Sequence, residues 1–401
     1  MNNVRIRSDL DCWNLDGLEF FRKPTSKGSI QVTNIKEDIS GLNRMEILSK
    51  ADQFGVTIVL CLRSKSRVIQ RVEIRRDSNK ISNNHTWETN TQFVDMAIDE
   101  DRLFGLIRHN DKHYIKMYRV IPDRLLSQQD WEWSIGPHYL TELSRIRITS
   151  LKKSKIAYVG PCRDGLFLSI ELDSGQVTPL KAHFPNGEPG LGPELDFCVD
   201  PESHSLFIAD TGHHRVVEVN CSTGLTKTIC GVGRPGDARE GELATRAALN
   251  SPRSIALYRH RALIRQGLLD SQSISFIQSD PDGVKPRTLL VADSANFPVK
   301  KIVDLAFFAS QALSLPDEPF LYTLLGSGQN LKGKPQKISD KHRQDLRQLP
   351  ISPPTDLLID SEGDLLIYSR SSQTNILLRP STAMSMELIK SRASDAHTTD
   401  P

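Results

Sequence analysis

Residues Leu195–Gly233 read LDFCVDPESHSLFIADTGHHRVVEVNCSTGLTKTICGVG, and they contain four short apolar runs in succession. The runs are DFCV, SLFIAD, RVVEVN and TKTICGVG, and each is ended by turn-forming residues. This pattern predicts one sheet of four antiparallel strands joined by tight turns. A single sheet of this kind exposes apolar surface on both faces and therefore needs neighbouring sheets to cover it.

Similar candidates for an inner strand recur along the chain as RMEIL, VDMAID, RIRIT, LDFCVD, SIAL and TDLLID. The matching apolar positions in these strands are Ile47, Ile98, Ile148, Val199, Leu257 and Ile359. Successive positions in this series are 51, 50, 51, 58 and 102 residues apart. A repeat near 50 residues is typical of a propeller blade. The last interval could hold two blades, and we interpret it as one blade with two long loops. The sequence thus predicts an all-β, six-bladed β-propeller of four-stranded antiparallel blades, with seven blades as the alternative.

Three segments resemble the NHL repeat. IADTGHHRVVEV (residues 208–219) carries the strongest likeness, and LLVADSANFPVKKIVDL (residues 289–305) carries a weaker one. GVGRPGDAREGELATRAALNSPRSIAL (residues 231–257) is similar to the link between two NHL blades. The earlier repeats lack the Ala-Asp pair of this signature and have RSKSR, RHNDK and GPCRD in its place. The resemblance implies a propeller, and related propellers bind protein, bind RNA or, occasionally, catalyse reactions.

The whole chain fits one domain. We expect a single propeller over residues 1–390, with insertions at 259–287 and 328–348 and a disordered tail at 391–401. Strand candidates within residues 18–35 lie outside the complete repeats, and we expect one of them to complete the last blade, because this removes an open sheet edge.

Composition narrows the protein class. A net charge of +2 gives no overall attraction to nucleic acid or membrane, and no apolar run reaches the length of a membrane-spanning helix. The charged N-terminus does not resemble a signal peptide, so we expect a cytoplasmic protein. None of the six cysteines forms a C-x-x-C pair, and the sequence predicts no metal site and no cofactor.

The order of strands predicts which loops share a face. If strands a to d run from axis to rim, the b–c turns and the links between blades lie on one face of the propeller. These turns are mostly basic, and they supply the candidate binding residues Arg63, Arg67, His109, Arg163, His213, His214 and Arg370. The competing interpretation is that such turns are simply solvated loops. For Asp210, Asp293 and Arg215 we favour a structural role, in which they tie turns together.

Three functions remain open on the sequence alone. The first is a non-enzymatic scaffold that binds a protein or peptide partner. The second is binding of RNA or another anionic ligand, although few aromatic residues accompany the basic turns. The third is a propeller hydrolase or lyase with an axial metal, for which no catalytic residue can be named. The sequence leaves the oligomeric state open.

Overall fold

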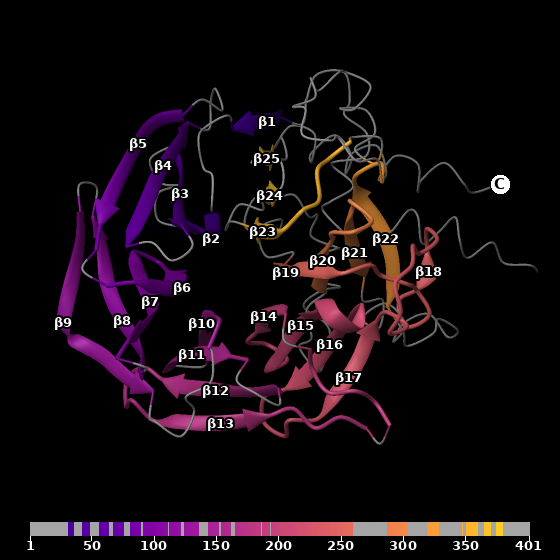
Figure 1. Ribbon diagram of the computed structural model, residues 1–401, viewed down its shortest axis with the longest axis horizontal. Helices are drawn as coiled ribbons and strands as arrows, with labels where there is room; N and C mark the ends of the chain where they lie inside the picture. The colour runs from indigo at the N-terminus through magenta and orange to yellow at the C-terminus, as the bar shows by residue number, and fades with distance from the viewer. Residues whose placement is uncertain are drawn as a thin grey trace, which may run out of the picture.

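The computed structural model describes the part of the chain in which the strands lie (Figure 1). The described residues are 31–35, 42–48, 56–63, 67–75, 81–89, 91–110, 112–121, 124–135, 143–151, 154–161, 165–185, 187–192, 194–259, 287–303, 319–328, 347, 350–359, 365–369 and 374–379. Among them, no helix is long and apolar enough to cross a membrane.

Consecutive strands of the described chain pair antiparallel and build the sheets in order of sequence. The first sheet contains β2 (Leu42–Leu48), β3 (Val56–Arg63), β4 (Val68–Arg75) and β5 (Ile81–Glu88). The second contains β6 (Phe93–Asp99), β7 (Arg102–His109), β8 (Lys112–Ile121) and β9 (Arg124–Ile135). The third contains β10 (Arg145–Leu151), β11 (Ser154–Gly160), β12 (Leu166–Glu171) and β13 (Val177–Lys181).

The fourth sheet is the one predicted from the opening stretch. It contains β14 (Leu195–Asp200), β15 (Ser205–Asp210), β16 (Arg215–Asn220) and β17 (Thr226–Cys230). The next sheet has five strands, in the spatial order β18 (Glu242–Leu243), β22 (Phe320–Leu325), β21 (Val299–Val303), β20 (Arg287–Asp293) and β19 (Pro252–Arg259). β19 pairs directly with β20, so the strands on either side of residues 260–286 belong to one sheet, as the sequence predicted.

The last sheet joins the two ends of the chain. It contains β23 (Asp356–Ile359), β24 (Leu365–Ser369) and β25 (Thr374–Arg379), and its outer strand is β1 (Gln31–Ile35). β1 pairs antiparallel with β25. The expectation that an N-terminal strand completes the last sheet is confirmed. The physical benefit is that β25 keeps no unpaired edge along this register.

The six inner strands form a closed ring. β2 packs beside β6, β6 beside β10, β10 beside β14, β14 beside β19, β19 beside β23, and β23 beside β2 (Figure 1). The all-β propeller architecture with four-stranded antiparallel blades is therefore confirmed. The prediction of six or seven four-stranded blades is corrected. Among the described residues, five sheets have four strands each, and the β19 sheet has a fifth strand, β18. β18 comes from the link that follows β17, and its two residues were too short to predict as a strand from their sequence.

The core lies between neighbouring sheets rather than within one of them. Phe167 of β12 and Phe197 of β14 meet edge to face with ring centroids 5.3 Å apart, in a cluster that also holds Leu206 and Val217. The inner-strand apolar positions at 50-residue spacing are only half-buried, and at Ile98 and Val199 they pack at the border of such clusters. The proposed single domain over residues 1–390 stays a prediction, and the tail 391–401 lies outside the described residues.

Candidate functional site

The start of each inner strand defines one face of the propeller. The first residues of all six inner strands contact one another across the axis, as described below, so these strands begin at the same end of it. The b–c turns and the links between sheets must lie at that end too, because adjacent strands are antiparallel. We call this end the turn face, and it carries those candidate binding residues that lie in the described part of the chain.

The structure describes four of the seven candidate side chains. Arg67, before β4, and His109, at the end of β7, are exposed, whereas His213 and His214, between β15 and β16, are half-buried. Arg63 is the last residue of β3, and nothing is described of its side chain. Arg163 and Arg370 lie outside the described residues. Of the four described side chains, the structure brings together only the adjacent pair His213 and His214.

Asp210 organises the turn that holds these histidines. Its carboxylate is fully buried and accepts hydrogen bonds from Gly192 N at 3.0 Å, Arg215 Nε at 3.0 Å and the Nδ1 of His213 at 3.0 Å. The Nη2 of Arg215 also donates hydrogen bonds to the carbonyl oxygens of Pro189, at 2.6 Å, and Gly190, at 3.1 Å. The predicted structural role of Asp210 and Arg215 is confirmed, since together they tie the turn to the preceding link.

Asp293 plays the same structural part in the next sheet. Its carboxylate accepts hydrogen bonds from Asn250 N at 2.6 Å and from Asn296 Nδ2 at 2.8 Å. Burial raises the pKa of this carboxyl to about 6, although these two hydrogen bonds and the Lys300 ammonium oppose the shift. The carboxyl is thus anchored between backbone and side chain, and its predicted structural role is confirmed.

His214 is fixed by its backbone and by its ring. The residue adopts a left-handed conformation with φ 51°, and its Nδ1 accepts a hydrogen bond from Ser251 N at 3.0 Å. An imidazole nitrogen that accepts a backbone N–H carries no proton, so the neutral ring is protonated at Nε2. His214 therefore keeps an N–H donor that no described residue uses.

Val232 is an exposed apolar side chain beside this turn. It is 39% exposed and lies between Gly231 and Gly233, whose φ angles are 99° and 75°. A Cβ at Gly231 would lie 2.5 Å from the carbonyl oxygen of His214, so the link passes directly against the histidine turn. Within the described chain, the other exposed large apolar residue is Leu225, at 63%, in the turn between β16 and β17 on the opposite face.

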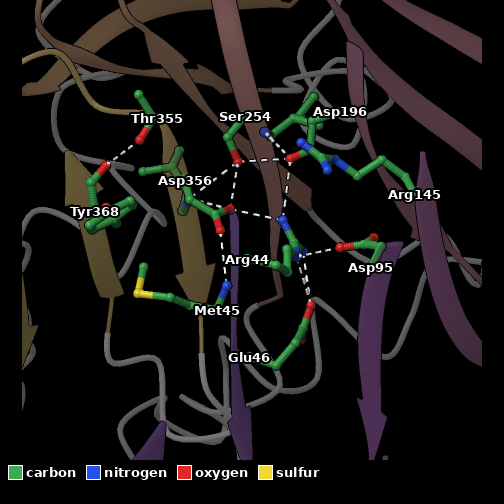
Figure 2. Close-up of polar contacts among 12 residues, drawn as sticks. Arg44, Met45, Glu46, Asp95, Arg145, Asp196, Ser254, Thr355, Asp356 and Tyr368 are labelled. Atoms are coloured by element: carbon green, nitrogen blue, oxygen red, sulfur yellow. Dashed lines mark hydrogen bonds and ion pairs between the residues drawn. The ribbon is translucent and has the colours of Figure 1, made fainter. Parts of the chain in front are cut away.

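A second polar constellation lies at the axis itself. The six inner strands place equivalent residues there, at the positions three before the apolar set that marks the repeat: Arg44, Asp95, Arg145, Asp196, Ser254 and Asp356. Glu46 and Arg147 follow two residues further along β2 and β10. We call these eight residues the axial network, most of which Figure 2 shows.

Arg44 is the centre of the axial network. Its Nη1 donates to Asp356 Oδ1 at 2.8 Å, while its Nε and Nη2 both donate to Glu46 Oε1, at 3.0 and 2.9 Å (Figure 2). Asp95 and Asp196 lie 3.9 and 3.8 Å from the same guanidinium. Arg44 is thus paired with four carboxylates from four different sheets.

Arg147 makes the second set of ion pairs. Its Nη1 lies 3.4 Å from Asp95 Oδ2, and its Nη2 donates a hydrogen bond to Asp196 Oδ1. Arg145 is less engaged, with its Nε 3.7 Å from Asp196 and its Nη1 donating to Ser144 O at 3.3 Å. Arg147 therefore bridges the β6 and β14 sheets, and Arg145 adds a second contact from β10 to Asp196.

The axial network also connects successive sheets through backbone hydrogen bonds. Asp95 accepts from Ile146 N at 2.9 Å, and Asp196 accepts from Ile255 N at 3.4 Å. Ser254 accepts from Leu357 N at 3.2 Å, and Asp356 accepts from Met45 N at 3.4 Å. In each case a side chain of one inner strand receives an N–H of the next, and the last bond spans the junction at which the ring closes.

Burial and charge shift the carboxyl pKa values in opposite directions. Burial raises the pKa of Glu46 and of Asp356, even though the Arg44 guanidinium works against the shift in both. The pKa of Asp196 is lowered, because Arg147, Arg44 and Arg145 together outweigh the effect of its burial. Neighbouring carboxylates in one network thus differ in how readily they take a proton.

The sequence analysis missed the axial network. Its signal was present, because a charged or hydroxyl residue stands three positions before every apolar position of the repeat. In each strand taken alone, that residue looks like an ordinary solvated position of a polar–apolar alternation. Among the described residues, no group of three or more His, Cys, Asp or Glu side chains is arranged to hold a metal ion.

Comparison with known proteins places the chain by its fold. No family model matches the sequence. No curated protein matches it either. Among solved structures, a protein of unknown function from Bacteroides thetaiotaomicron is 13% identical, covers 89% of this chain and 74% of its own, and has a TM-score of 0.56.

Two further solved structures match over most of this chain. An auxiliary nutrient binding protein from Bacteroides ovatus is 13% identical over 88% of this chain and 77% of its own, with a TM-score of 0.52. The WD40 β-propeller domain of Doa1 is 10% identical over 90% of this chain and 99% of its own, with a TM-score of 0.42. At 13% identity, the two structures with TM-scores above 0.5 show a likeness in fold alone.

Proposed function

We propose that this chain is a non-enzymatic, NHL-like propeller scaffold that binds a protein or peptide partner on its turn face. The observation that carries the proposal is that the exposed Val232 belongs to a link that passes against the turn of His213 and His214. We call these three residues the His–Val surface. It combines an exposed apolar side chain with imidazole groups on backbone that is already fixed.

Preorganisation is the physical reason for favouring this surface. The histidine turn is held by Asp210 and Arg215, and the adjoining link is held by Gly231 N donating to Ala244 O at 3.0 Å. A rigid loop loses little conformational entropy when a partner docks, so more of the contact energy appears as affinity. Val232 supplies apolar area, and the Nε2–H of His214 supplies a directional donor. Both are features of protein-binding surfaces.

One neighbour in fold is described as a nutrient binding protein, and binding rather than chemistry is also the role that we propose here. A fold of this kind hosts many functions, so the proposal rests on the His–Val surface and not on the likeness.

The proposal can be tested with a matched pair of variants. Val232→Glu places a charge on the turn face, and Leu225→Glu places the same charge on the opposite face, at the other exposed apolar side chain. Both side chains are solvent-accessible, so both variants should keep the wild-type melting temperature within about 1 °C, as expected for surface substitutions. Tagged protein is used to capture partners from a lysate, with crosslinking and mass spectrometry to identify them.

We expect Val232→Glu to lose the captured protein and Leu225→Glu to retain it. Equal capture by both variants would remove the turn face as the binding site. Capture that disappears after ribonuclease treatment would instead assign the face to RNA.

A further inference from the structure

The axial network contains an odd number of charges. It holds three guanidinium groups, from Arg44, Arg145 and Arg147, and four carboxyl groups, from Glu46, Asp95, Asp196 and Asp356. Ser254 is the remaining member and carries no charge. If every carboxyl group were ionised, the network would have a net charge of −1.

That charge would be buried. The side chains of Asp95 and Asp196 are 0% and 3% exposed, and that of Glu46 is 15% exposed. An uncompensated charge removed from water is costly, and a carboxyl group in this position commonly takes a proton instead. Within the described part of the chain, the charge count and the burial together therefore call for a counter-charge of +1 at the axis.

Hydrogen bonding shows which carboxyl group can take the proton most easily. Asp95, Asp196 and Asp356 each accept a backbone N–H from the next inner strand, and these bonds favour the ionised form. Among the described residues, Glu46 accepts from Arg44 alone, and both of those bonds go to Oε1. Asp95 also has one oxygen, Oδ1, without a hydrogen-bond donor among these residues, but its Oδ2 accepts both the Ile146 N–H and Arg147 Nη1, and its side chain is 0% exposed. The Oε2 of Glu46 receives no hydrogen bond from the described chain, and the partial exposure of Glu46 gives a proton access from solvent.

We propose that the axial network is a binding site for one proton, and that Glu46 holds it in the folded protein. Figure 2 shows Glu46 pointing toward Arg44 from the side opposite Asp356. Protonation converts Glu46 to a neutral acid, which leaves the charge of Arg44 to the three aspartates. The Arg44–Asp356 ion pair joins β2 to β23, so the proton strengthens the contact at which the ring closes. The raised pKa of Glu46, caused first by its burial, agrees with this assignment.

The sign of the pH dependence follows from linkage. A carboxyl group whose pKa is higher in the folded than in the unfolded protein contributes stability that is complete below the unfolded pKa, near 4.3 for Glu. That stability is lost as the pH rises toward the folded value. Between the two values, unfolding releases up to one proton, and the unfolding equilibrium constant rises up to tenfold per pH unit.

The test compares wild type with Glu46→Gln, which imitates the protonated acid at every pH. Urea unfolding is measured from pH 4 to pH 8 at constant ionic strength. We expect the two proteins to have similar unfolding constants near pH 4, and the variant to become relatively more stable by tenfold or more as the pH rises. Glu132→Gln is the control, since Glu132 lies on the outer strand β9, is 42% exposed and pairs with Lys116 at 3.6 Å. Its ratio to wild type should stay flat.

Two results would overturn the proposal. One is a Glu46→Gln variant that is less stable than wild type by the same factor at every pH, because Glu46 would then act as an anion. The other is a wild-type protein stabilised specifically by K⁺ over tetramethylammonium at pH 7, which would assign the counter-charge to a metal cation. Carboxyl ¹³C NMR of wild-type protein at pH 6 decides the matter without any variant: a neutral Glu46 supports the proposal, and an ionised Glu46 refutes it.

Discussion

Replacing Arg44 by Met should destabilise the propeller more than any exposed charge replacement. Arg44 is buried and pairs with Glu46 and Asp356 at 2.9 and 2.8 Å, so its loss leaves carboxyl groups without their counter-ion in the core. Breaking a buried ion pair by removing one partner costs about 3–5 kcal/mol. With an unfolding entropy of roughly 2.1 cal/mol/K per residue, 4 kcal/mol lowers the melting temperature of a chain of this length by about 5 °C.

The measurement is urea unfolding at pH 7, with the melting temperature as a second reading. The matched control is Arg119→Met, because Arg119, on β8, is 59% exposed and lies 3.5 Å from Asp101. An exposed ion pair contributes about 0–1 kcal/mol. Adding Asp356→Asn to Arg44→Met should recover part of the loss, since it removes one of the stranded carboxylates. A loss for Arg44→Met no greater than that for Arg119→Met would refute the reasoning.

Three further predictions follow from the packing, the ring closure and the buried carboxyl at the turn face. Phe167→Ala should cost about 3–5 kcal/mol in urea unfolding, because the fully buried ring packs edge to face on Phe197 between two sheets; a loss below 1 kcal/mol would contradict this packing. Deleting residues 1–35 removes β1 and leaves the edge of β25 unpaired, so the variant should self-associate in a concentration-dependent way, which light scattering measures. A deletion variant that stays monomeric would argue against this role of β1. Asp293, with its pKa of about 6, contributes stability that is complete below pH 4 and is lost as the pH rises through 6, so Asp293→Asn should flatten the urea stability profile over that range; an unchanged profile would contradict it.

The strand pattern could be predicted from the sequence because it depends on residues that are close together along the chain. Alternation in SLFIAD and RVVEVN, with turn residues between them, determines a hairpin whatever surrounds it, and the register Ser205↔Asn220 to Asp210↔Arg215 follows from the turn. The spacing of about 50 residues extended this prediction to a propeller. The role of Asp210 and Arg215 was predictable for the same reason, since their hydrogen bond spans only five residues.

The number of strands in each sheet was less accessible. β18 pairs with β22 across nearly eighty residues of chain, and β1 pairs with β25 from the opposite end of the sequence. A closing N-terminal strand was expected from the general cost of an open edge. The two residues of β18 carry no strand pattern of their own, and only the position of β22 makes them a strand.

The axial network was decided by tertiary structure alone. Arg44 and Asp356 are 312 positions apart, and the ion pair exists only because six separate strands begin at one end of one axis. The sequence by itself determined that a polar residue occurs at the start of every inner strand. Whether such a residue meets water or a partner depends on what stands across the axis, and that follows from the closure of the ring. In this protein, the closure of the ring brings three guanidinium groups together with four carboxyl groups at the axis. Because the ring also removes these groups from water, positions that look ordinary and polar in the sequence form a buried network of charges.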